Sequence, residues 1–139
     1  MTTANAKALG REKRARKASS KSAQRKSCDV AFSLWVRSIG VCEAAGEGNG
    51  CKGNLQCAHV LTRGYSSIRW DPRNALSLCA GHHIFFTHRP IAWTDFIVAK
   101  LGQAHWDELR RLAITPAPTP DYRELLAEIR SWEPRCPAF

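Results

Sequence analysis

Four residues in the middle of the chain have the types and spacing of a zinc site. Cys79 and His82 form a Cys-x-x-His pair, which allows both side chains to reach one tetrahedral ion, and Cys42 and Cys51 come from a glycine-rich loop. Closure by four protein ligands indicates a structural site, which would clamp the loop to the following helix in a domain too small to rely on its core alone. Cys57 is a competing ligand, although an isolated cysteine is more often a small buried side chain.

A second set of residues, His59, Asn74 and His83, lies within the runs LQCAH and RWDPRNALSLCAGHH. These runs resemble the HNH, or His-Me finger, endonucleases. They are most similar to the phage recombination nucleases of the NinG type and to related prophage HNH proteins. The resemblance covers about residues 32–101. It implies an α+β fold, with a small ββα-metal core, a structural zinc and flanking helices.

The resemblance also implies a role for each of the three residues. His59 corresponds to the general base that deprotonates water, a step that contributes about 10² to 10⁴ in rate. Asn74 corresponds to the residue that holds the loop and orients His59, or in some relatives binds the metal. His83 corresponds to a ligand of one catalytic divalent ion, Mg²⁺, Mn²⁺ or Ni²⁺. Because adjacent helical residues point about 100° apart, His82 can bind zinc while His83 faces the cleft.

The chain departs from the family pattern at two positions. Many HNH proteins carry Asp, Glu or His just before the base as a second metal ligand, but this chain has Ala58. Ala45 stands where the second cysteine of the family's common Cys-x-x-Cys would lie, so Cys51 must replace it. The second ligand of the catalytic ion therefore stays open.

Three arginines, Arg63, Arg69 and Arg73, surround the loop between His59 and Asn74. Arginine is a common phosphate ligand, and such contacts position nucleic acid without reading its sequence. We expect these side chains to bind the backbone beside the cut, with a solvated charged loop as the alternative.

The elements that must position these residues follow from apolar periodicity and from glycine and proline. Apolar residues at helical spacing predict a helix over 29–39 that Gly40 ends. Short apolar runs predict strands over 55–60 and 75–78. Further helices are predicted over 80–87, 93–101, 103–112 and 121–132, the last of them after a stiff proline-rich linker.

Charge divides the chain unevenly. Residues 1–27 contain nine Lys or Arg and a single acid, Glu12, whereas the whole chain has a net charge of +9. We expect this segment to be a disordered arm attracted to a polyanion, above all nucleic acid, with a solubility tail as the alternative. Residues 28–114 would form the nuclease domain. Residues 115–139 would supply a linker and a C-terminal helix packed on the core.

No stretch approaches the roughly 20 apolar residues of a membrane helix, and no signal-peptide core is present near Met1. We expect a soluble cytoplasmic protein, in a bacterial host or encoded by a virus. Thiols stay reduced there, so six cysteines interleaved with histidines indicate metal before disulfides.

These observations favour a metal-dependent endonuclease that cuts DNA with low sequence specificity. The alternative is a non-catalytic, zinc-stabilised DNA-binding or assembly module that keeps the fold. A redox or metal-storage protein would explain the cysteines but not the basic arm. DNA is the expected partner. Double-strand cleavage would require a homodimer or two encounters, and phage recombination or packaging proteins are further candidate partners.

Overall fold

The computed structural model describes residues 3–137, and their side chains except those of 15–19. Residues 1, 2, 138 and 139, which belong to the predicted arm and C-terminal segment, lie outside this range. The elements, in chain order, are α1 Thr3–Ser19, α2 Lys21–Arg37, β1 Leu55–His59, η1 Ser66–Ile68, η2 Pro72–Asn74, β2 Ala75–Cys79, α3 Ala80–Thr87, α4 Pro90–Leu101, α5 Gln103–Ala113 and α6 Tyr122–Ser131.

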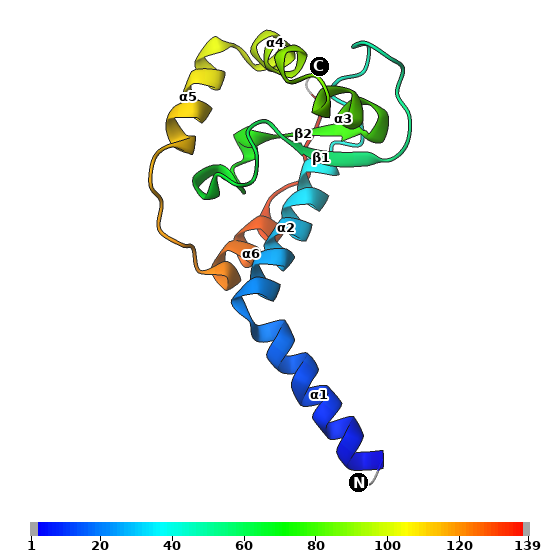
Figure 1. Cartoon of the computed structure of the whole chain (residues 1–139), viewed down its shortest axis with the longest axis vertical. Helices are drawn as coiled ribbons and strands as arrows, with labels where there is room; N and C mark the ends of the chain where they lie inside the picture. Colours follow the sequence, from blue (N-terminus) through cyan, green and yellow to red (C-terminus); the bar gives the residue numbers. More distant parts are fainter. Residues whose placement is uncertain (1–2, 138–139) are drawn as a thin grey trace.

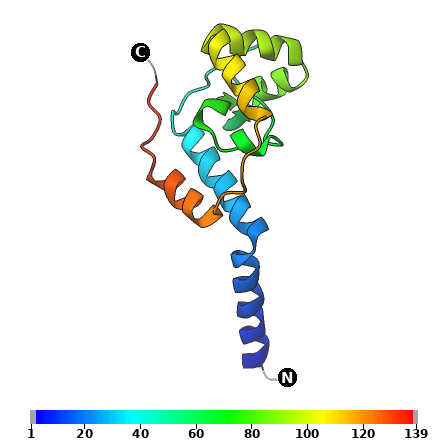
Figure 2. The same ribbon diagram turned by 90° about the vertical axis from the view of Figure 1, so that its left-hand side faces the viewer.

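Residues 3–19 and 21–27 of the segment expected to be a disordered arm are helical in the structure. α1 projects away from the rest of the molecule (Figures 1 and 2), and α2 follows after Ser20. The Ser20 side chain caps α2 by accepting a hydrogen bond from the backbone N–H of Ala23 at 3.2 Å. The segment is rich in Ala, Lys and Arg, all of which favour helix, so low apolar content did not prevent helix formation.

α2 begins well before the predicted start at residue 29 and ends at Arg37, close to the predicted end. Its buried residues, Cys28, Phe32 and Val36, recur every four positions and so form one apolar face. Gly40 follows in the left-handed region at φ 76°, where glycine is favoured, and the chain turns into the loop that carries Cys42 and Cys51.

β1 and β2 form an antiparallel pair in which Leu55 lies opposite Cys79 and His59 lies opposite Ala75. Every residue of β2 is buried, because both faces of this small sheet are covered. One core lies on the face that packs on α2 and α6, and it includes Phe32 and Ala75. The other lies beneath α3, α4 and α5, and its buried members are Ala44, Ala58, Val60, Leu76, Leu78, Phe86, Ile97 and Leu109.

α6 packs beside α2, as both views show (Figures 1 and 2). Trp35 and Trp132 meet edge to face with ring centroids 5.0 Å apart, and the Trp35 indole donates to the carbonyl of Glu133 at 2.9 Å. The α+β class expected from the sequence is confirmed, and both strands lie within one residue of their predicted bounds. No helix among residues 3–137 is both long and apolar enough to cross a membrane.

Candidate functional site

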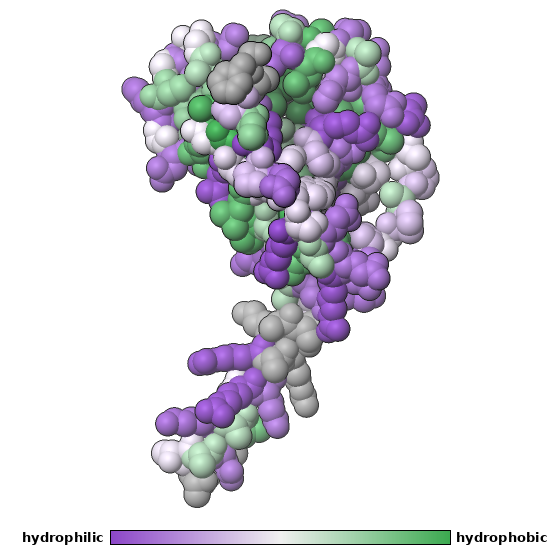
Figure 3. Space-filling view, turned by 180° about the vertical axis from the view of Figure 1, so that it is seen from behind, coloured by the Kyte–Doolittle hydropathy of each residue, from purple (hydrophilic) through white to green (hydrophobic). Residues whose placement is uncertain are grey.

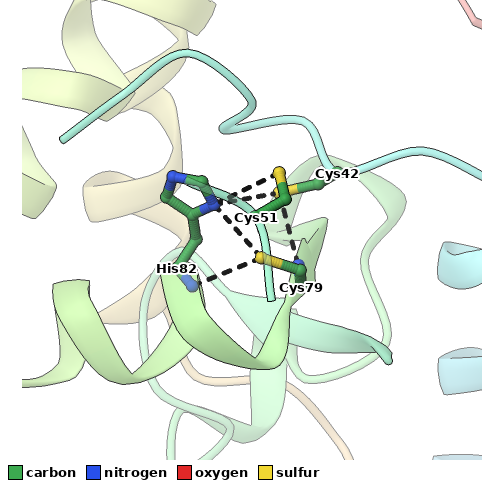
Figure 4. Close-up of side chains that lie close together, drawn as sticks. All are labelled: Cys42, Cys51, Cys79 and His82. Carbon is green, nitrogen blue, oxygen red and sulfur yellow. Dashed lines mark hydrogen bonds between the residues drawn. The ribbon is translucent and has the colours of Figure 1, made fainter. Parts of the chain in front are cut away.

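Cys42, Cys51, Cys79 and His82 converge on one point, with their ligand atoms within 4.8 Å of one another (Figure 4). Nδ1 of His82 lies 3.5, 3.6 and 3.1 Å from the sulfur atoms of Cys42, Cys51 and Cys79. In a tetrahedral zinc site with ordinary bond lengths, neighbouring ligand atoms are separated by about 3.5 to 3.8 Å. These four residues, which we call the Cys/His cluster, therefore fit a metal ion such as zinc.

Local backbone structure brings the cluster together. Cys79 is the N-cap of α3, and His82 lies in its first turn. The loop after Cys51 is held to this turn by hydrogen bonds from Ala80 to the carbonyl of Asn54 and from Gly81 to the carbonyl of Lys52, both 2.9 Å. The approach requires Gly53, whose φ is 77° and at which a Cβ would lie 2.8 Å from that of Ala80.

The hydrogen bonds around the cluster suit two of its residues, His82 and Cys79, to binding a metal. Nε2 of His82 donates to the carbonyl of Glu47 at 2.6 Å, which leaves Nδ1 unprotonated in the neutral ring. The Cys79 sulfur accepts backbone N–H bonds from Lys52 and His82 at 3.4 Å. Although burial raises it, these bonds lower the pKa of the Cys79 thiol to about 6. Desolvation and the neighbouring thiols raise the pKa of Cys51 to about 11.

His59, at the end of β1, is held by its backbone and aromatic neighbours. A carbonyl can only accept, so Nε2 of His59 donates to the Arg69 carbonyl at 2.9 Å, and Nδ1 carries the lone pair of the neutral ring. Phe32 stacks on the imidazole with centroids 5.8 Å apart. Burial lowers the pKa of His59, the Arg69 bond opposes this, and the charge of Arg63 adds to it. The ring is therefore neutral near neutral pH.

His83 lies on α3, beside His82 but directed to a different site. Its Nδ1 donates to Oε1 of Gln56 at 2.7 Å, which leaves Nε2 unprotonated. Burial lowers the pKa of His83 as well. His59 and His83 both line a surface pocket of about 720 Å³ and a second of about 250 Å³. The two imidazoles thus share a cleft along β1, whereas His82 belongs to the Cys/His cluster.

Asn74 is fully buried and holds the loop between the strands. Its Oδ1 accepts from the backbone N–H of Leu61 at 2.8 Å, and its Nδ2 donates to the carbonyls of Leu61 at 2.9 Å and Ile68 at 3.1 Å. These bonds fix the loop next to Arg69, whose carbonyl holds His59. Asn74 therefore acts on His59 through the backbone of the loop.

The three arginines expected to bind phosphate lie in different environments. Arg63 lines the larger pocket together with His59 and His83. Arg69 forms an ion pair with Asp29, with its Nη2 2.6 Å from Oδ2, so its guanidinium is already engaged. Arg73 pairs with Asp71 at 2.8 Å, and its side chain is 51% exposed. Of these three arginines, Arg63 alone lines the larger pocket, and within the described part of the chain its guanidinium forms no ion pair.

Cys57 and Ala58 are neighbours on β1 that point to opposite faces of the sheet. Cys57 is not in the Cys/His cluster; it lies on the α2 face, where burial raises its thiol pKa to about 11, as for a small buried side chain. Ala58 is buried in the other core and offers no metal ligand.

Sequence reasoning did not single out several residues that shape the cleft. Asp29, Phe32 and Arg37 reach it from α2, and Gln56 reaches it from β1. Arg37 carries a further positive charge, and its Nε donates to Ser33 at 3.2 Å. The sequence feature that could have indicated them is helical spacing, because Phe32 and Arg37 lie about one and two turns after Asp29 and so on the same side of the helix.

Comparison with family models, with curated proteins and with solved structures returned no match for this chain.

Proposed function

We propose that this chain is a metal-dependent endonuclease of the HNH class that hydrolyses DNA phosphodiester bonds with low sequence preference, in a phage or prophage context. The observation that carries the proposal is the pairing of His59 and His83. They come from β1 and α3 and line the same two pockets. Two strands followed by a helix, with a Cys/His cluster at their junction, are the arrangement that the sequence resemblance implies.

In this proposal His59 acts as the general base. Its Nε2 is occupied by the Arg69 carbonyl, so Nδ1 accepts a proton from water as the water oxygen attacks phosphorus. The bond from phosphorus to the 3′ oxygen breaks, leaving a 5′ phosphate and a 3′ hydroxyl that takes a proton from solvent. Because burial keeps the pKa of His59 below its usual value, the base is available near neutral pH.

The cleft is also electrostatically suited to a phosphate. Arg63 and Arg37 line the larger pocket from two different elements, the loop after β1 and helix α2. The projecting arm adds hydrophilic side chains to the surface (Figure 3), among them Lys7, Arg11 and Arg14. Such an arm supplies affinity for any nucleic-acid sequence through counterion release.

His83 is the residue that would hold the catalytic ion. With Nδ1 bonded to Gln56, Nε2 is the atom that would bind a divalent ion such as Mg²⁺, Mn²⁺ or Ni²⁺. When bound, such an ion supplies polarisation of the scissile phosphate and stabilisation of the departing oxygen.

The test is incubation of supercoiled plasmid with the purified chain and Mg²⁺, Mn²⁺ or Ni²⁺, with His59→Ala in parallel. His105→Ala is the matched control, because His105 donates to an arginine carbonyl at 2.8 Å in the same way but lines neither pocket. We expect nicking by the wild type and by His105→Ala, and a loss of about 100-fold or more in His59→Ala. Equal nicking by both variants, or none by the wild type with any ion, would overturn the mechanism.

A zinc-stabilised DNA-binding module without catalysis is the second candidate. One observation favours it. Within residues 3–137, the one group of Cys, His, Asp and Glu side chains close enough to hold a metal ion together is the Cys/His cluster, which does not include His83. Ala58 also provides no acidic side chain that could bind an ion together with His83. A mobility shift of DNA without nicking, in all three ions, would select this function over hydrolysis.

A further inference from the structure

We propose that Asp29 is a positioning residue that fixes the orientation of His59 by anchoring the side chains of Arg69 and Trp70, and with them the peptide whose carbonyl binds His59. This inference rests on the proposed function of His59 as a base. It assigns to α2 a part in the reaction that the sequence did not suggest.

The Asp29 carboxylate accepts three hydrogen bonds from two consecutive residues. Oδ1 accepts from Nε of Arg69 and from Nε1 of Trp70, each at 2.9 Å, and Oδ2 accepts from Nη2 of Arg69 at 2.6 Å. The ion-paired side chains of Asp29 and Arg69 are only 22% and 16% exposed, so water competes weakly for these bonds. The carboxylate therefore ties the side chains on both sides of the 69–70 peptide to α2.

That peptide carries the oxygen that holds the base. The Arg69 carbonyl accepts the Nε2 proton of His59 at 2.9 Å. Asn74 fixes the preceding carbonyl, that of Ile68, at 3.1 Å. The backbone that carries this oxygen is thus anchored on one side by the bond from Asn74 to the Ile68 carbonyl, and on the other by the bonds from Asp29 to the side chains of Arg69 and Trp70.

α2 also contacts the imidazole directly. Phe32 follows Asp29 by three positions, on the same side of the helix, and its ring stacks on His59 at an interplanar angle of 29°. One helix therefore limits the tilt of the imidazole through Phe32 and its rotation through Asp29 and Arg69. A general base held in this way has a fixed Nδ1 direction, and a misplacement of about 1 Å in such a group can cost about 100-fold in rate.

Steady-state nicking kinetics of Asp29→Ala and Asp29→Asn test the inference, with Glu108→Ala as the matched control. Glu108 forms a comparable paired contact with Arg111, at 2.7 and 2.8 Å, but lies on α5 away from the cleft. We expect kcat to fall about 10- to 100-fold in Asp29→Ala with KM for DNA within about twofold. Asp29→Asn, which keeps acceptor oxygen in place, should recover part of the loss. Unchanged kcat, or a loss confined to KM, would overturn the role.

A second readout does not depend on activity. ¹⁵N NMR of the imidazoles, assigned with His59→Ala, should report a proton on Nε2 of His59 in the wild type and a mixture of tautomers in Asp29→Ala. If Asp29→Ala does not fold, Asp29→Asn and Arg69→Lys provide the same comparison. A wild type that never nicks but shows the tautomer change would refute the nuclease and keep the positioning role. A wild type that nicks with kcat and tautomer unchanged in the variants would refute the positioning role alone.

Discussion

Replacement of Cys79 by alanine is the most informative test of the metal centre. Cys79 contributes one ligand atom, caps α3 and accepts two backbone N–H bonds, all from a side chain that is nearly fully buried. Residues 45–53 of the loop that it anchors are exposed throughout, so apart from hydrogen bonds to α3 the loop gains little from burial. The change should therefore lower metal content and stability together.

The size of the effect follows from linkage. Structural zinc binds with about 10 to 16 kcal/mol of apparent free energy, so one ligand of four accounts for roughly 3 kcal/mol, or about a 100-fold weaker affinity. With free zinc at about 1,000 times the wild-type Kd, binding stabilises the wild type by about 4.1 kcal/mol and a 100-fold weaker variant by about 1.4 kcal/mol. The difference of about 2.7 kcal/mol corresponds to a fall in Tm of roughly 10 °C for a chain of this size.

The assay is thermal unfolding at fixed free zinc, together with the zinc content of each sample. Cys136→Ala is the matched control, because Cys136 is an exposed thiol outside the Cys/His cluster. Zinc content is compared at a lower free zinc, about ten times the wild-type Kd, where we expect about 0.9 zinc per chain in the wild type and in Cys136→Ala and about 0.1 in Cys79→Ala. Unchanged zinc content and Tm in Cys79→Ala would refute the ligand assignment, and an equal loss in Cys136→Ala would refute its specificity.

Three further predictions follow from the cleft and the arm. Asn74→Ala removes three hydrogen bonds from a buried side chain to the backbone, so urea titration should give a free energy of unfolding lower by about 3 kcal/mol; a loss under about 1 kcal/mol would contradict its role in the loop. The pKa of His59 lies below its ordinary 6.5, so the nicking rate should be level near neutral pH and fall as pH drops through that lower pKa; a rate that rises on acidification would exclude a neutral base. Replacing Lys7, Arg11 and Arg14 by Gln should reduce the slope of log affinity for DNA against log salt by up to about 2.7, whereas an unchanged slope would remove the arm from the DNA interface.

The Cys/His cluster could be predicted because its signal is chemical and partly local. Cysteine and histidine are the preferred zinc ligands, and the Cys-x-x-His spacing at a helix start brings Cys79 and His82 together in any such turn. The loop ligands were harder, because Cys57 was equally suitable by type. Geometry distinguishes them, since the sulfur of Cys51 lies 3.6 Å from Nδ1 of His82, whereas Cys57 packs on the α2 face of the sheet.

The positioning of His59 could not be predicted, because it depends on contacts between distant segments. Charge alone marked Arg69 as a phosphate ligand, but the folded chain brings Asp29 to its guanidinium. The same limit applied to the arm. Low apolar content predicted disorder, while the helix propensity of its Ala, Lys and Arg residues and the cap at Ser20 produced two helices.

Strand β2 connects the Cys/His cluster to the loop that holds His59, and this connection indicates which histidine each of them positions. Cys79 ends this fully buried strand and Asn74 precedes it, so the Cys/His cluster and the loop that holds His59 lie at opposite ends. α3 starts directly from the cluster and carries His83, whereas His59 is fixed by Arg69 at the other end. Loss of an ion held by the Cys/His cluster should therefore displace His83 and leave His59, the proposed base, in place.

Cys51→Ser, a mild change at the exposed ligand, tests this division. We expect it to raise the Mn²⁺ concentration needed for half-maximal nicking by about tenfold, because α3, which carries His83, is then less firmly held by the Cys/His cluster. The Nε2 proton of His59 should stay visible by ¹⁵N NMR. Ser38→Ala provides a control at a site outside both the cluster and the histidine pair. A change in the His59 tautomer without a change in Mn²⁺ requirement would mean that zinc supports the base instead, and that β2 transmits rather than separates the two sites.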